Sequence, residues 1–383
     1  MTIKEYFKIT NRKPILCGTF DYIDKASREL IHKLCQQNGI INVQTYSTNF
    51  FPQMVILEKI PYIIWDNAYW DLSTNILANI IALCSVENST VKNNTERIIE
   101  LELYKFLSLY FYDNLEMSLE FTNKYRKLAA NPCTIDANNL KRAEMSLALN
   151  TLNIYTQIYC FFHEKEHIDY AESPQLYKVA EEEYTAVQES LMGIDVIDIG
   201  VDEIKDLNEY IEYIRAKFLK NDFEQFREEL ICDYNAFIAA GTYICSLDKN
   251  SDKAKVYTRL MESINYINII NHNLNNISVY MRLLLNGYSQ QERRKVFSEL
   301  NEKNVFRFCY SGYSRMLVTL VLEKKTGISH FNPDYYFLSN IENHKNIMAD
   351  VLLKILDEYP DYELFKKRYT DNVKNSRDFL LMY

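Results

Sequence analysis

Residues 158–170 read IYCFFHEKEHIDY and contain the pattern His163-Glu164-x-x-His167. On an α-helix, two histidines four positions apart lie on one face and one turn apart, so both imidazoles can reach a single metal ion. Zinc binds histidine nitrogens at about 2.0–2.1 Å and lowers the pKa of a bound water toward about 7. Glu164 stands beside the first histidine and can take a proton from that water as a general base. These residue types therefore predict a site that makes a hydroxide nucleophile near neutral pH.

Such a site needs a third protein ligand, because catalytic zinc takes three and leaves its fourth position to water. The best candidate downstream is Glu229, and Glu228 is a competing ligand one residue away. Asp233 follows Glu229 on the same helical face, where it can accept the Nδ1–H of a zinc-bound histidine, which we expect to be His163. The residues that follow are small, which lets this helix approach a neighbouring helix closely: Ala236, Ala239, Ala240 and Gly241.

The combined pattern resembles the gluzincin metallopeptidases, in which an HExxH motif is followed by ExxxD. The resemblance implies a zinc ion bound by His163, His167 and Glu229. It further implies that Glu164 is the general base and that Asp233 supports a ligand from behind. In zincin-like peptidases a small sheet borders the cleft, and its edge strand can pair with an extended peptide substrate. A sheet that only covers the helical core is the alternative.

A zinc hydrolase also benefits from a hydrogen-bond donor aimed at the oxyanion of the tetrahedral intermediate. Candidates after Asp233 are His272, Tyr280 and Arg282. The chain has 30 tyrosines, so Tyr280 alone carries little weight. We therefore predict His272 as a second catalytic residue; the alternative is a histidine satisfied at the surface or in the core.

Composition and charge exclude several classes of protein. Of the 383 residues 48% are hydrophobic and 14% aromatic, which favours a packed core over disorder. The net charge is −9 and no basic block stands out, so a nucleic-acid partner is not expected. We expect neither a signal peptide nor a membrane span, because the chain lacks both patterns. The eight cysteines show no CxxC spacing and are interpreted as reduced thiols of a cytoplasmic protein.

The predicted fold is α+β and predominantly α-helical, with a small N-terminal β-sheet, a zincin-like helical core and C-terminal helices. Extended segments are expected at 40–46, 54–60 and 62–65, in a mostly antiparallel sheet. Apolar periodicity predicts helices at 19–37, 71–84, 95–129, 138–171, 175–192, 202–219, 222–246, 251–275, 278–285, 290–302, 305–325, 333–358 and 362–382. We place a metallopeptidase core at 1–250, with its β-rich part at 40–66, and a C-terminal helical region at 251–383.

The predicted function is a zinc-dependent peptidase that acts on a peptide or protein substrate. One alternative is a carboxylate-bridged di-iron bundle, which takes Glu-x-x-His pairs from two helices. The pairs Glu164/His167 and Glu29/His32 have this spacing, but the second leads into the β segments and the scheme leaves His163 without a role. The other alternative is a helical interaction protein without enzymatic activity.

Overall fold

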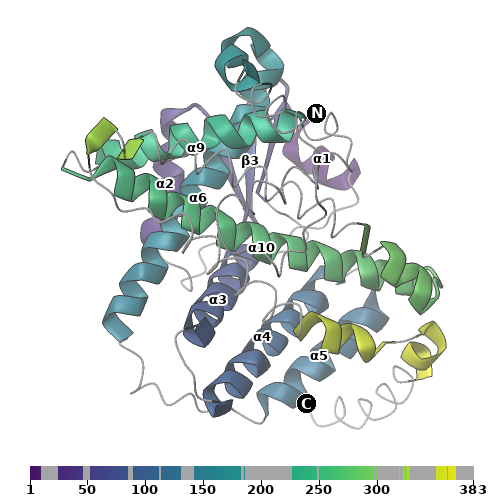
Figure 1. Ribbon diagram of the computed structural model, residues 1–383. Coiled ribbons are helices and arrows are strands. Elements are labelled where there is room, and N and C mark those ends of the chain that lie inside the picture. The colour runs from purple at the N-terminus through teal and green to yellow at the C-terminus, as the bar shows by residue number, and fades with distance from the viewer. Residues whose placement is uncertain are drawn as a thin grey trace, which may run out of the picture.

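Figure 1 shows the computed structural model of the chain, in which helices dominate and a small sheet lies near the N-terminus. The predominantly helical α+β fold predicted from the sequence is therefore confirmed. The structure describes residues 1–9, 25–45, 52–84, 89–111, 114–130, 142–182, 185, 227–247, 250–296, 298–299, 319, 322–323, 325–327, 351–359 and 361–367.

The sheet has three strands in the order β1-β3-β2: β1 Ile41–Thr45, β2 Gln53–Leu57 and β3 Ile60–Asp66. Strand β1 runs parallel to β3 and β2 runs antiparallel to it, so the expectation of a mostly antiparallel sheet was wrong. The strand predicted at 54–60 corresponds to β2 but ends earlier, at Leu57, because the chain reverses at Glu58 and Lys59. Both residues have positive φ, 53° and 66°, as a two-residue type I′ hairpin turn requires. Neither is Gly, Asn or Asp, so the usual sequence signal of this turn is missing.

The longer elements are helices: α1 Ile3–Ile9, α2 Lys25–Gln37, α3 Asn67–Cys84, α4 Ser89–Tyr110, α5 Leu115–Ala129, α6 Arg142–Glu172, α9 Arg227–Leu247 and α10 Lys253–Leu285, with a short 3₁₀ helix, η2, at Pro174–Tyr177. Further helical turns include residues 290–296, 351–357 and 362–367. The predicted helix at 202–219 lies outside the described residues, as do parts of those at 19–37, 95–129, 138–171, 175–192, 222–246, 290–302, 305–325, 333–358 and 362–382.

In two places the division of the chain into helices differs from the prediction. The segment 95–129 holds two helices, because the side chain of Asn114 accepts from the amide of Met117 and starts α5 as an N-cap. Conversely, 251–285 is one continuous helix, α10, capped at its start by Asp252. The asparagines near its middle do not interrupt it, since asparagine lowers helix stability only modestly.

Helix α10 connects the two halves of the molecule in Figure 1. It packs against α6 and α9 beside the sheet and against α3 and α4 in the other half. A side chain at Gly241 of α9 would overlap the ring of Tyr257, so α9 and α10 touch closely at this point. The predicted division of the chain near residue 250 stays a prediction, because α10 contacts helices from the N-terminal part directly.

Helix α9 is the most apolar of the long helices near the site. By length and composition alone it could cross a membrane, but half of its most apolar window is buried inside the fold. Its buried side chains include Ile231, Phe237 and Ile244, which join the same core as Ile158 and Phe161 of α6. Helices α6 and α9 thus contact each other through buried apolar side chains, and their polar residues lie next to this contact.

Candidate metal centre

Helix α6 places both histidines of the motif on one side. Ile158 and Phe161 are buried in the core and hold the helix in its orientation. His163 and His167 then lie one turn apart with their rings perpendicular, at an angle of 86°. Their Nε2 atoms are 3.3 Å apart and face the same point.

Glu229, near the start of α9, completes a group of three. Its carboxylate oxygens lie 3.6 Å from Nε2 of His163 and 3.7 Å from Nε2 of His167. Two atoms that each lie about 2.0–2.1 Å from a tetrahedral zinc ion are about 3.3 Å apart. The two Glu229 distances are to different oxygens, Oε2 for His163 and Oε1 for His167. One ligand atom from each of the three residues lies within 4.8 Å of the other two, which is close enough for the three to hold one metal ion. This is the only group of three such side chains among the described residues that could hold a metal ion.

Asp233 lies behind His163, as the sequence predicted. Its Oδ1 atom is 3.1 Å from Nδ1 of His163. The same oxygen accepts a hydrogen bond of 2.6 Å from the hydroxyl of Tyr159. Tyr159 was not predicted, although it stands four residues before His163 and so on the same helical face. A proton on Nδ1, facing buried Asp233, directs the lone pair of Nε2 of His163 toward the shared centre.

Glu228 takes the corresponding place behind His167. Its Oε1 atom is 2.9 Å from Nδ1 of His167, on the far side of the ring from Glu229. The sequence left Glu228 and Glu229 as competing third ligands, and the structure separates them. Glu229 faces the two Nε2 atoms, whereas Glu228 contacts the nitrogen that points away from the shared centre.

When the proton of each imidazole is on Nδ1, next to a carboxylate, both Nε2 atoms present lone pairs to the shared centre. In that tautomer the two Nε2 atoms and the carboxylate of Glu229 all face the shared centre as acceptors. A metal ion or a proton can lie between these groups, and the 3.3 Å contact between the two Nε2 atoms is a hydrogen bond when one of them carries the proton. The donor set, two imidazoles and one carboxylate, suits Zn²⁺.

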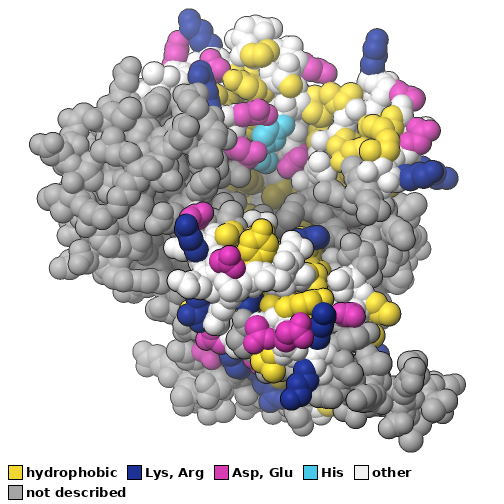
Figure 2. Space-filling view, turned by 90° about the vertical axis from the view of Figure 1, so that its right-hand side faces the viewer, with side chains coloured by type: hydrophobic (Ala, Val, Ile, Leu, Met, Phe, Trp, Pro, Cys, Tyr) yellow, Lys and Arg dark blue, Asp and Glu magenta, His cyan; other side chains and the backbone are white. Residues whose placement is uncertain are grey.

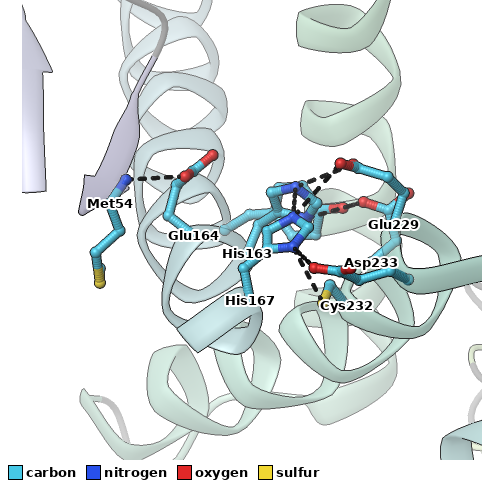
Figure 3. Close-up of polar contacts among 9 residues, drawn as sticks. Met54, His163, Glu164, His167, Glu229, Cys232 and Asp233 are labelled. Carbon is cyan, nitrogen blue, oxygen red and sulfur yellow. Dashed lines mark hydrogen bonds and ion pairs between the residues drawn. The ribbon is translucent and has the colours of Figure 1, made fainter. Parts of the chain in front are cut away.

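Glu164 points to the other side of α6, toward the sheet (Figure 3). Its Oε2 atom accepts a hydrogen bond of 3.0 Å from the backbone amide of Met54 in β2. Burial raises the pKa of the Glu164 carboxyl, while His163 and the Met54 amide act in the opposite direction. A carboxyl whose pKa is moved toward neutrality suits proton transfer at the operating pH.

The cluster is open to solvent on one side. The side chains of His163, His167 and Glu229 are 14%, 24% and 35% exposed. Figure 2 shows histidine side chains at the surface, with acidic side chains next to them and hydrophobic ones above. A catalytic zinc site requires such an open side for water and substrate.

Two cysteines lie near the cluster without joining it. The sulfur of Cys232 is 3.7 Å from Nδ1 of His167, again on the side away from the shared centre. Burial raises the pKa of Cys232 and of Cys160, which favours their neutral thiols. Both behave as the small apolar side chains of a core.

The remaining candidates have other surroundings. His272 belongs to α10, but its side chain is outside the described residues. Tyr280 is buried beneath the guanidinium group of Arg293, and Arg282 donates to the hydroxyl of Tyr110. His32, from the second Glu-x-x-His pair, is exposed and contacts Gln36.

Comparisons with protein-family models, with curated proteins and with solved structures found no match for this chain. The resemblance to gluzincins therefore rests on five residues of α6 and α9 and on their arrangement.

Proposed function

We propose that this protein is a zinc-dependent peptidase. The observation that carries the proposal is the convergence of His163, His167 and Glu229 at distances typical of zinc ligands, with an open side toward solvent. Glu164 follows His163 on α6 and lies near enough to both histidines for their charges to oppose the rise in pKa that burial causes, and Asp233 and Glu228 lie behind the two imidazoles. The substrate class is a peptide or a protein.

Zinc, when bound, supplies a Lewis acid that polarises the scissile carbonyl and makes water more acidic. Glu164 accepts a proton from the attacking water as the new C–O bond forms. It returns this proton to the amine nitrogen as the C–N bond breaks, so that the products are a carboxylic acid and an amine. Asp233, supported by Tyr159, keeps His163 in one tautomer throughout.

The decisive experiment separates metal binding from proton transfer. Zinc content is measured by mass spectrometry, and hydrolysis is measured with a mixture of fluorogenic peptides. Glu164→Gln is expected to keep one zinc per chain and to lose roughly 10²–10⁴-fold in rate, the usual contribution of a general base. Glutamine can still accept from Met54, so the surrounding structure is preserved.

Glu166→Gln is the matched control, because Glu166 lies on the same helix but is hydrogen-bonded to Tyr177. This variant should keep both zinc and activity. Full activity in Glu164→Gln would refute the proposed mechanism. Two irons per chain instead of one zinc would favour the di-iron alternative, and no bound metal would remove the enzymatic interpretation.

A further inference from the structure

Strand β2 has an outer edge, because it pairs with β3 on one side and ends the described sheet on the other. In an antiparallel pair, the amides of successive residues point alternately toward the partner strand and away from it. The amide of Met54 points away from β3 and donates to Oε2 of Glu164. This amide is thus not used by the sheet and is available to the site.

The contact joins two elements that are 110 residues apart in sequence. Strand β2 lies against α6, and Figure 3 shows Met54 and Glu164 facing each other on the side of α6 away from Glu229. A glutamate side chain on a helix has several rotamers, and a fixed main-chain donor selects among them. With Oε2 engaged by Met54, the second oxygen of Glu164 remains to accept a proton.

We propose that the backbone N–H of Met54 is the positioning group of Glu164, so that the edge of the sheet holds the general base in its working orientation. This inference rests on the proposed function. It assigns to β2 a task that does not depend on how substrate binds.

Proline at position 54 tests the proposal, because it removes this donor without breaking a bond of the ladder. Proline is tolerated at sheet edges where the lost N–H faces outward. In Met54→Pro we expect kcat to fall roughly 10-fold, as for a lost hydrogen bond to a charged group, with KM and zinc content unchanged. In a Glu164→Gln background the same change should add little, since the group that Met54 positions is no longer a base.

Two controls isolate the amide. Met54→Ala removes the side chain, which packs on the core, but keeps the N–H. Ile56→Pro removes the next outward-facing amide of the same strand, at a position that is 44% exposed. Both should keep the wild-type kcat. An equal loss in either control, or full kcat in Met54→Pro, would overturn the proposal.

A second measurement needs no activity. Hydrogen exchange of the Met54 amide, followed by NMR, should be slow in the wild type and in Glu164→Gln, and at least about 10-fold faster in Glu164→Ala. Exchange at Ile56 should not change. Equal exchange at Met54 in all three proteins would show that the contact does not form. If the contact forms but the wild type hydrolyses nothing, the proposed function fails, and with it the catalytic meaning of the contact.

Discussion

Two clusters of polar side chains are built into this fold, one between α6 and α9 and the other around Tyr359. In the second, the hydroxyl of Tyr359 donates to Glu120 at 3.2 Å, and its backbone carbonyl accepts two bonds of 3.1 Å from Arg293. Glu120 and Arg293 are 1% and 0% exposed. Nearby, the ammonium group of Lys124 and the hydroxyl of Tyr104 both contact Glu358. In each of these contacts a donor meets an acceptor.

The cluster between α6 and α9 differs in the kinds of side chains that meet at its centre. Carboxylates lie next to both Nδ1 atoms, and its centre brings together two imidazoles and the carboxylate of Glu229. Buried polar residues that satisfy one another stabilise a fold, whereas two imidazoles and a carboxylate around one point form a set of ligands that suits zinc. The comparison shows why the first cluster is a candidate site and the second is a structural network.

The largest expected effect, and the strongest test of this difference between the two clusters, comes from removing a proposed metal ligand. His163→Ala or Glu229→Ala should weaken zinc binding by more than about 100-fold, beyond the loss typical of the groups behind a ligand. In the wild type, EDTA should lower the melting temperature, because a metal that binds only the folded state stabilises it. Zinc content after dialysis and thermal unfolding measure both effects. If EDTA leaves the wild type unchanged, the centre holds no metal.

Removing the charge of the carboxylate behind each histidine should show whether a buried carboxylate supports zinc binding more than an exposed one. Asp233→Asn should weaken zinc binding by about 10–100-fold, since its side chain is 5% exposed and also accepts from Tyr159. Glu228→Gln should cost only a few-fold, because a carboxylate that is 59% exposed is screened by water. Competition with a fluorescent chelator gives both affinities. Equal losses would mean that burial does not govern this support.

The network around Tyr359 should respond in stability and not in metal binding. Tyr359→Phe removes a donor from buried Glu120 and should lower the free energy of unfolding by about 1–3 kcal/mol. Tyr362→Phe is the control, because the described contacts of that ring are with Phe365 and Lys366. Urea unfolding and zinc content report the result. Loss of zinc in Tyr359→Phe would show that the two clusters are coupled.

The smallest effect is expected at Glu102 of α4, a buried carboxyl outside both clusters. Burial raises its pKa, and Lys105 and Asn75 offset this only in part. Its protonated form is therefore favoured in the folded state, and the stability it contributes is lost as pH rises from its ordinary pKa of 4.5 through the raised value. Glu102→Gln should thus melt at the wild-type temperature near pH 4 and slightly higher at pH 7. A variant that is less stable at pH 7 would contradict this sign.

The part of the site that follows from helix geometry could be predicted from the sequence. A spacing of four places His163 beside His167, and the same spacing on α9 places Asp233 next to His163 when Glu229 faces the metal. These relations need only the period of a helix.

The rest of the site depends on contacts between elements. The role of Glu228 depends on how α9 is rotated against α6, which sequence spacing does not set. The donor to Glu164 is a main-chain amide, and every residue except proline has one, so Met54 carries no signal in its side chain. The hairpin at Glu58 and Lys59 was missed for a related reason, because both residues adopt a conformation that their types rarely choose.

Gly241 has a consequence for chemistry that takes place far from it. It lies twelve residues after Glu229 on the same helix, α9, which is about 18 Å along the helix axis at 1.5 Å per residue. Any larger side chain at 241 would overlap the ring of Tyr257, so either this ring or helix α9 would have to shift. If α9 shifted, the position of Glu229 relative to the two imidazoles would change as well, although Gly241 lies more than three turns away from it.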